Sequence, residues 1–537
     1  MNNFIVRWTN VYDQLLTKNI VSPAWQRIIL GLILTVCVIV RLLTISAPAL
    51  DRTAWKEIDY LMISTNYWQS GFNFLRPEVS WPAEPPHVTE MEFPLVPFSA
   101  ALLYKIFGFN VYTARLITLF AFLLLAVYVF KLAQRELGPI VGITAAFAAA
   151  VMPLYHPMGR YLFTEPLMIA MSVVTLYHLA EWVDFQRRRD WILSLFALSL
   201  TIALKVEVLY LFLPISWLAF RKYRWQLAQY KGLLAIVFLA ILLPIAWYAY
   251  AYYLENIGAH VFGIFKGHNK FQTLTMLTTP SWYRTMGRRM IVDILGGIIG
   301  PFLCIIGLLA AARLRQAGLF FVYLAAIGVY VILVAEGNLD APYRQLTSVP
   351  PLSMFVAMGA VALLVTVVII VTSIKDTFVP QGQLQIIVLV GCIVLLSLVP
   401  LLRYNEILGR DGPSHPYRWQ ISQEIEKYTA SDSKLVVAGE YSIHVGGNDL
   451  SPVLYHYTGL QGWSLQPEDW NRQYVESLIQ KGATHFVVLA TFNKYDNWPF
   501  FLAPDFIQEM KAHYKVLCED EERPLLILDL RQPNNID

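Results

Sequence analysis

Long apolar runs recur along the chain from Ile28 to about Leu402. Runs of this length with few charges are typical of membrane-spanning helices, and we count roughly eleven of them by length and polarity. The pattern therefore predicts a polytopic α-helical membrane protein. The predicted spans are Ile28–Ser46, Val111–Phe130, Ile140–Leu154, Pro166–Val183, Trp191–Leu204, Val206–Phe220, Leu233–Tyr253, Ile291–Ala311, Ala317–Ala335, Pro350–Val371 and Gln385–Leu402.

The pattern changes after about Arg403, where short β-branched runs alternate with amphipathic, helix-like ones. This alternation predicts a small α/β domain with a partly parallel sheet. The expected helices are Trp419–Tyr428, Tyr474–Gln480 and Phe506–Tyr514, and the expected strands are Leu435–Ala438, Phe486–Leu489 and Leu525–Leu530.

Basic residues set the expected orientation, because cytoplasmic loops of membrane proteins are rich in Lys and Arg. Arg7, Lys18 and Arg27 precede the first span, and further basic residues follow at alternate loops. We therefore expect a multi-pass protein of the plasma (inner) membrane with a cytoplasmic N-terminus. The predicted parts are a cytoplasmic segment 1–27, a transmembrane domain 28–403 with outer loops 48–108 and 254–290, and an extracytoplasmic α/β domain 404–537.

Composition supports a membrane protein. The 537 residues are 56% hydrophobic and only 15% charged, against about 25% charged in soluble proteins. The net charge of +3 is too small to indicate a nucleic-acid partner, and no basic cluster with interleaved aromatics is present. The four cysteines lack the spacing of a zinc site or a disulfide framework.

Four carboxylates stand out in the first outer loop: Glu57, Asp59, Glu90 and Glu92. Glu57 and Asp59 fall near the start of an expected surface helix from Trp55 to Ser70, where carboxylates also favour the helix dipole. Glu90 and Glu92 share one side of an extended segment. Two interpretations stay open for each pair: chemistry at the membrane surface, or ordinary charges on a solvated loop.

A second group of charges lies at the ends of predicted spans. Arg160 and Glu165 flank the outer end of one span, as a functional pair or a structural ion pair. Lys205 divides two apolar runs whose helices reach only about 21–23 Å, short of the roughly 30 Å hydrocarbon thickness. Lys205 should therefore lie below the outer surface and need an anionic partner. The candidates are Glu207 and the phosphate of a lipid.

The outer loop 254–290 is basic and aromatic, against the rule that basic residues stay cytoplasmic, and it includes Arg288. Tyr343 and Arg344 follow a later span. Cations and aromatics at an interface bind lipid head groups or simply anchor a loop. Both interpretations remain open for these residues.

In this order and topology, the motifs resemble those of the GT-C membrane glycosyltransferases, in particular the protein O-mannosyltransferase-like and aminoarabinose-transferase-like bacterial proteins. The first loop of that family carries an Asp-Glu-x-x-Tyr motif. Here Glu57 matches the Glu and Tyr60 the Tyr, but Lys56 stands at the position of the Asp, which is the usual catalytic base. Glu92-Phe-Pro resembles a further family segment. The resemblance covers about the first 350 residues well.

The resemblance implies a GT-C fold and transfer of a sugar from a polyprenyl-phosphate carrier to an acceptor hydroxyl on the outer face. The acceptor is a lipid, a glycan or a protein, and membrane lipids surround the chain. Glu57, or else Asp59, is then the expected base, and Lys205, with Arg160 or Arg288, is expected to stabilise the leaving phosphate. The expected catalytic residues are Glu57, Asp59 and Glu165. The residues expected to bind substrate or the lipid phosphate are Lys205, Arg160, Glu90, Glu92, Tyr343, Arg344 and Arg288.

No cofactor is firmly implied. A divalent cation stays open, with Glu57 and Glu165 as the residues that would hold it together with donor phosphate oxygens. Two other functions also remain: a lipid or sugar transporter or flippase, and an assembly protein whose α/β domain binds a partner. A transporter usually has ionisable residues near the bilayer midplane, whereas the acids here cluster in outer loops.

Overall fold

We describe the protein from a computed structural model. It describes residues 22–43, 45–49, 54–153, 160–258, 261–265, 273–374, 379–410, 416–438, 452–465, 469–489, 504–520 and 525–534, with positions 8, 9, 11, 12, 14, 270 and 271. Most of the predicted N-terminal segment 1–27 and part of the predicted outer loop 254–290 lie outside these residues.

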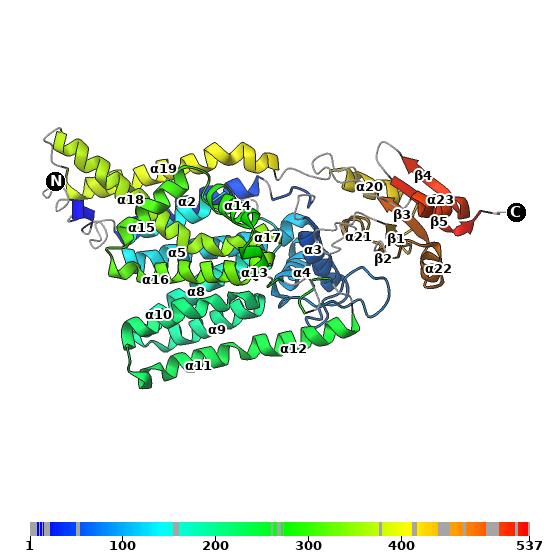
Figure 1. The fold of residues 1–537 in the computed structure, drawn as a ribbon, viewed down its shortest axis with the longest axis horizontal. Helices are drawn as coiled ribbons and strands as arrows, with labels where there is room; N and C mark the ends of the chain where they lie inside the picture. The colour runs from blue at the N-terminus through cyan, green and yellow to red at the C-terminus, as the bar shows by residue number, and fades with distance from the viewer. Residues whose placement is uncertain are drawn as a thin grey trace. The chain divides into compact units, whose positions relative to one another are not determined.

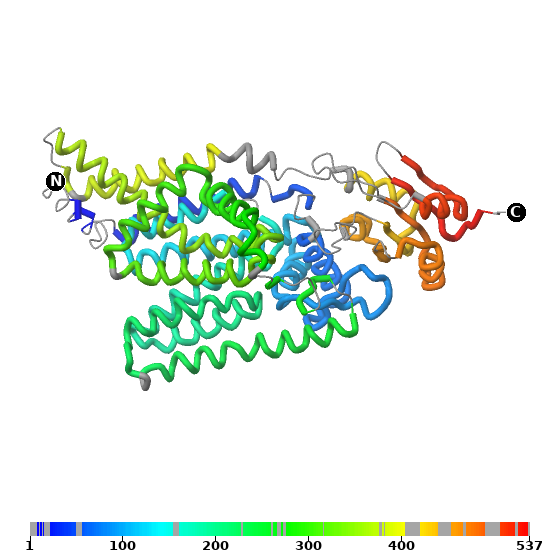
Figure 2. The backbone as a smooth tube through the Cα atoms, in the orientation of Figure 1, coloured from blue at the N-terminus to red at the C-terminus, as the bar shows by residue number. Residues whose placement is uncertain are grey.

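The chain divides into two compact units. Figure 1 draws their helices and strands, and Figure 2 traces the backbone. Unit 1 comprises Met1–Ser46, Arg115–Tyr248 and Asn269–Arg410. Unit 2 comprises Ala47–Ala114, Ala249–His268 and Asp411–Asp537. Unit 2 thus joins most of the first predicted outer loop, a short central segment and the C-terminal part of the chain, which are far apart in the sequence.

The regular elements among the described residues of unit 1 are all helices. Two helices, α5 (Val111–Leu137) and α12 (Leu242–Ile257), pass from one unit into the other. The remaining helices of unit 1 are α2 (Pro23–Leu42), α6 (Pro139–Val151), α8 (Thr164–Phe185), α9 (Arg188–Leu204), η1 (Val206–Leu211), α10 (Phe212–Tyr223), η2 (Leu227–Tyr230), α11 (Lys231–Ala240), α13 (Thr273–Leu277), α14 (Pro280–Arg288), η3 (Arg289–Ile294), α15 (Ile299–Ala311), η4 (Arg315–Ala317), α16 (Gly318–Leu333), α17 (Ala335–Asp340), η5 (Pro342–Ser348), α18 (Val349–Ile374) and α19 (Gln381–Arg410).

Local sequence explains where several helices begin. Ser22 caps α2 by accepting the Trp25 N–H at 3.4 Å, and Pro23 occupies the first helical position, where its missing N–H costs nothing. Pro139 opens α6 in the same way, directly after Gly138, whose φ of 89° a residue with a Cβ rarely adopts. These signals determine the residue at which each helix begins, which its apolar composition alone does not determine.

The predicted multi-pass helical architecture is confirmed, although the count of about 11 spans is not. Within the described residues, six helices are long and apolar enough to cross a membrane, and a seventh is added if a pair bent by 95° forms one span. That pair consists of Pro280–Ile294 and Ile299–Ala311. Other predicted spans are shorter apolar helices, such as α6 and α16. At 1.5 Å per residue, the 13 residues of α6 reach only about 20 Å.

Two glycines bring α15 and α18 into backbone contact. A Cβ on Gly307 would overlap the carbonyl oxygen of Phe355, and a Cβ on Gly359 would overlap that of Leu303. Small residues at helix crossings allow this close approach. Van der Waals packing then holds the helices together, because lipid gives no hydrophobic driving force for their association. The pair therefore fixes the register between two long helices of unit 1.

Unit 2 contains a five-stranded sheet in the order β2-β1-β3-β5-β4. β2, β1 and β3 run parallel, whereas β5 is antiparallel to both β3 and β4, so the predicted partly parallel sheet is confirmed. The elements of unit 2 are α3 (Ala54–Gln69), α4 (Leu95–Phe107), α20 (Pro416–Glu426), β1 (Lys434–Ala438), α21 (Pro452–Thr458), β2 (Gln461–Leu465), α22 (Arg472–Gln480), β3 (His485–Leu489), α23 (Pro504–His513), β4 (Tyr514–Asp520) and β5 (Leu525–Pro533).

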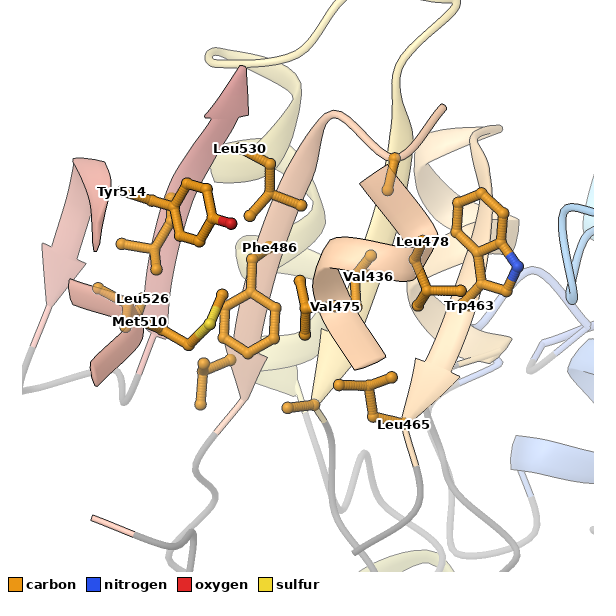
Figure 3. Packing of buried hydrophobic residues seen from close by; sticks show 14 of the residues in the cluster. Val436, Trp463, Leu465, Val475, Leu478, Phe486, Met510, Tyr514, Leu526 and Leu530 are labelled. Atoms are coloured by element: carbon orange, nitrogen blue, oxygen red, sulfur yellow. The ribbon is translucent and has the colours of Figure 1, made fainter. Parts of the chain in front are cut away.

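The core of this domain packs one face of the sheet against α22 and α23 (Figure 3). Val436, Phe486 and Leu528 come from the sheet, and Leu478 and Met510 come from the two helices; all are buried. The strand residues face the same side because side chains alternate along a strand. The apolar runs that predicted β1, β3 and β5 are therefore the runs that build this core.

The first predicted outer loop contributes to the same domain. Ala83 is buried in the hydrophobic cluster of the sheet. The Gly462 N–H of β2 donates to the Ser80 carbonyl at 3.2 Å, and Lys481 forms an ion pair with Glu84. The loop and the C-terminal domain are thus parts of one folded body, which their separation in the sequence did not predict.

Candidate active site

Lys205 lies where α9 ends and the tighter helix η1 begins. Its backbone is extended, with φ −162° and ψ 115°, so the helix is interrupted there. The Nζ atom donates to Oε1 of Glu165 at 2.6 Å, and both side chains are buried. Glu165 lies in the first turn of α8, where the helix dipole also favours a carboxylate. A buried ion pair therefore joins α8 to the break between α9 and η1.

A second ion pair lies beside the first. Arg344 in η5 pairs with Glu207 in η1, and the Tyr330 hydroxyl donates to Oε2 of Glu207 at 3.0 Å. Glu207, the predicted local partner of Lys205, thus pairs with Arg344, and Lys205 pairs with Glu165 instead. The same helix η5 brings Tyr343 next to Lys205, whose Nζ lies 5.5 Å from the centre of the Tyr343 ring.

The two pairs form a polar cluster in a largely apolar unit, which we call the ion-pair cluster: Glu165, Lys205, Glu207, Tyr330, Tyr343 and Arg344. Burying an ion costs several kcal/mol even after relaxation, and a buried pair is rarely the most stable solution for a core. Ionisable groups retained among membrane helices are therefore a reason to look for function. The two cations each have one carboxylate, so the cluster is formally neutral.

The remaining predicted cations of unit 1 have different surroundings. Arg160 is buried, with its guanidinium carbon 5.1 Å from the centre of the Tyr161 ring. Arg288 is exposed at the end of α14. Its neighbour Arg289 donates to the Asn338 carbonyl at 2.6 Å and to Gln345 of η5 at 3.4 Å. Arg289, which we did not predict, is thus the cation of this segment that contacts the helix carrying Tyr343.

Unit 2 gathers the predicted carboxylates of the first loop. Glu57, Asp59 and Glu90 are all buried, as is Lys56. In the described part of the chain, the Oδ1 atom of Asp59 has no hydrogen-bond partner. Burial raises the pKa of Asp59 well above its usual value, and the nearby Glu90 raises it further, while Lys56 opposes both. The lysine at the position of the family's Asp is therefore a counter-charge to Asp59.

Tyr60 links this group to Glu92 and to the central segment of unit 2. Its hydroxyl donates to Oε2 of Glu92 at 3.2 Å. The Phe262 ring meets the Tyr60 ring edge-on, with centres 5.8 Å apart. The Glu-x-x-Tyr part of the motif and the Glu92 segment are therefore neighbours.

His456 is a neighbour of Glu57 that the sequence did not indicate. It lies on α21, which packs against α3, and the Tyr457 hydroxyl accepts the Ala49 N–H at 3.0 Å. Burial lowers the pKa of His456 to about 4, although the Glu57 carboxylate opposes that shift. The imidazole is therefore neutral at pH 7. No sequence signal marks it, because its proximity to Glu57 depends on how the C-terminal domain packs.

Known proteins are similar to this chain in sequence family and in fold. Residues 86–248 match the family model described as dolichyl-phosphate-mannose-protein mannosyltransferase. The fold is similar to that of ArnT from Cupriavidus metallidurans bound to undecaprenyl phosphate, at 13% identity over 93% of this chain and 97% of ArnT, with a TM-score of 0.64. No curated protein matches the sequence.

A second solved structure points the same way. The Archaeoglobus fulgidus oligosaccharyltransferase, tethered with an acceptor peptide, matches with a TM-score of 0.54 at 10% identity, over 87% of this chain and 69% of that protein. The predicted GT-C fold of the membrane glycosyltransferases is therefore confirmed.

Proposed function

We propose that the protein is a membrane glycosyltransferase that moves a sugar from a polyprenyl-phosphate carrier to an acceptor hydroxyl on the outer face of the membrane. The observation that carries the proposal is the buried Lys205–Glu165 pair with Tyr343 and Arg344 beside it. The matched family description names a dolichyl-phosphate sugar donor, and the similar ArnT structure holds undecaprenyl phosphate.

The leaving phosphate of such a donor gains negative charge as the bond to the anomeric carbon breaks. A preorganised cation stabilises that charge most where water is excluded. We assign this role to Lys205, with Tyr343 beside it, and we regard Glu165 as the residue that positions Lys205 when no phosphate is bound. Arg344 is held by Glu207 and helps to place Tyr343 in the same short helix.

The acceptor hydroxyl must lose a proton as its oxygen attacks the anomeric carbon. The new carbon–oxygen bond forms as the bond to the phosphate breaks, so a single displacement inverts that carbon. A base must begin deprotonated, and the raised pKa of Asp59 disfavours it for this role. We therefore assign the role of the base, which accepts this proton, to Glu57, and we regard Asp59 as its buried neighbour.

A divalent cation held by Glu57 and Glu165 stays a prediction. In the described ranges, no three His, Cys, Asp or Glu side chains come together as ligands. Glu165 already has Lys205 as a counter-ion. The oligosaccharyltransferase of A. fulgidus was also solved with zinc and sulfate, but we assign no step here to a metal.

The central experiment identifies the substrates and then tests the residues. Cells that lack the protein should accumulate the lipid-linked sugar and lose one outer glycan, both measured by mass spectrometry. With that donor, Glu57→Gln should abolish transfer by the purified protein, while Glu78→Gln, on the same loop and paired with Arg76, should retain it. Full activity of Glu57→Gln would move the base elsewhere.

A matched pair tests the phosphate role. Lys205→Ala should chiefly weaken use of the donor, whereas Lys222→Ala, an exposed lysine at the end of α10, should not. Donor dependence that is unchanged in Lys205→Ala would refute this role.

Transport is the second candidate function, because the helix pair bent by 95° resembles the broken helices of transporters. In vesicles, a transporter moves labelled lipid-linked sugar across the membrane without covalent change. Recovery of the label only in a new glycosidic product would exclude this alternative.

A further inference from the structure

Glu90 makes an unusual set of contacts for a loop carboxylate. It is fully buried and accepts three successive backbone N–H groups from the central segment of unit 2: Val261 at 3.3 Å, Phe262 at 3.1 Å and Gly263 at 2.7 Å. The Thr89 hydroxyl donates to Oε2 at 3.1 Å. Both carboxylate oxygens are therefore occupied by the protein itself.

Three adjacent amides that converge on one carboxylate form an anion nest. Hydrogen bonds to an ionised acceptor are stronger than neutral ones, and here they offset part of the cost of burying the charge. Burial raises the pKa of Glu90, while the amides, that of Gly263 first, oppose the rise. Both oxygens of Glu90 thus accept hydrogen bonds, three of them from one backbone segment of unit 2.

Two further contacts hold the same segment on the first loop. A Cβ on Gly258 would overlap the Val88 carbonyl oxygen, so the two backbones touch there. The amides of Phe262 and Gly263 give the two shorter bonds to Glu90. The Phe262 ring meets the Tyr60 ring edge-on, with ring centres 5.8 Å apart. The Tyr60 hydroxyl in turn bonds Glu92. The segment Val261–Gly263 is therefore fixed against the motif that we assign to the reaction.

We propose that Glu90 is a positioning residue that holds Val261–Gly263 on the first loop, so that Phe262 fixes the Tyr60–Glu92 pair beside Glu57. The proposal rests on the proposed function. Glu90 acts only through the backbone that it binds, and Phe262 is the side chain through which the constraint reaches Tyr60. Glu90 and Phe262 thus belong to one chain of contacts, and their effects on the reaction should not be independent.

A double-mutant cycle in the full-length protein tests this chain of contacts. Glu90→Gln keeps the side-chain volume but removes the charge and one acceptor oxygen, whereas Phe262→Ala removes the ring and leaves the amides. Each single variant should lower kcat/KM for the lipid-linked sugar by about tenfold. The double variant should lose no more than the worse single variant, because both changes break the same constraint.

Hydrogen exchange supplies a measurement that does not depend on turnover. In Glu90→Gln, the amides of residues 261–263 should exchange at least about tenfold faster than in the wild-type protein. Glu78→Gln is the matched control and should change neither exchange at these amides nor kcat/KM.

Three outcomes decide the matter. Unchanged exchange in Glu90→Gln would overturn the proposal, since Glu90 then does not hold the segment. Fold losses that multiply in the double variant would overturn the link through Phe262 to the reaction. If the wild-type protein transfers no sugar, the proposed function fails, and the exchange measurement alone then decides whether Glu90 holds Val261–Gly263.

Discussion

The Lys205–Glu165 pair offers a quantitative test of how the ion-pair cluster is built. We consider Glu165→Gln, Lys205→Met and the double variant. At the observed Nζ–Oε1 distance of 2.6 Å, Coulomb's law with an effective dielectric constant of about 20 gives an attraction of about 6 kcal/mol. Desolvation of two buried ions costs a similar amount, so the net contribution of the pair is small.

The same balance makes each single variant costly. Either change leaves one buried charge without its partner, which typically destabilises a protein by about 3–5 kcal/mol. The double variant removes both charges and keeps similar volumes, so it should fall within about 2 kcal/mol of the wild type. The single losses sum to at least about 6 kcal/mol and the double variant loses at most about 2 kcal/mol, so the expected coupling energy between the two sites is at least about 4 kcal/mol.

The assay is reversible unfolding of the four proteins in mixed detergent micelles, followed by circular dichroism. Size-exclusion profiles check that each variant is folded at the start. If the loss in the double variant equals the sum of the single losses, the two side chains are independent. The ion pair would then not contribute as its geometry suggests, and Glu165 would not be the residue that positions Lys205.

Three further predictions concern ligand binding, packing and protonation. Undecaprenyl phosphate at 100 times its dissociation constant should stabilise the wild type by about 2.7 kcal/mol, which is measured as a rise in Tm. Lys205→Met should lose most of that rise. An equal rise in both proteins would contradict the phosphate role of Lys205. Gly307→Ala should lower stability by about 2 kcal/mol or more, because its Cβ meets the Phe355 carbonyl, whereas Gly328→Ala, which has open space, should be nearly neutral in the same unfolding assay. Folding raises the pKa of Asp59 above 3.8, so the folded state binds more protons than the unfolded state above that pH. The stability of the wild type therefore falls as the pH rises above that value, by at most about 1.4 kcal/mol per pH unit. The free energy of unfolding of Asp59→Asn, relative to that of the wild type, should therefore grow with pH until the raised pKa is passed. A difference in unfolding free energy that stays constant with pH would contradict the burial of that carboxyl.

Local patterns predicted most of the elements. The helix α3, the first-turn position of Glu165 and the strands β1, β3 and β5 follow from periodicity and start signals that need no tertiary information. The edge strands β2 and β4 were missed. β2 contains Gly462 and Ser464, and β4 is charged and exposed, so neither carries an apolar run. An edge strand buries less surface and leaves a weaker pattern.

The pairings could not be predicted, because they depend on which segments meet. Lys205 has a carboxylate two residues away, yet it bonds one 40 residues earlier in the sequence. Glu90 was a candidate ligand by composition, and only its contacts with residues 261–263 show that its oxygens are occupied. His456 carries no local signal at all. The sequence shows which ionisable side chains are present, whereas the packing of the fold decides which of them pair with one another.

The burial of Ala83 in the core of the C-terminal domain has a consequence for biogenesis. The first loop is made early, but β5 of the sheet that it packs against ends at Pro533, so synthesis must reach that strand before the loop finds its complete partner. The loop that carries Glu57 should therefore stay open to protease in a chain that stops before β5, and it should become resistant once β5 is added. Assembly of the acidic loop would then wait for β5, and a chain that stops earlier would carry Glu57 in an unassembled loop.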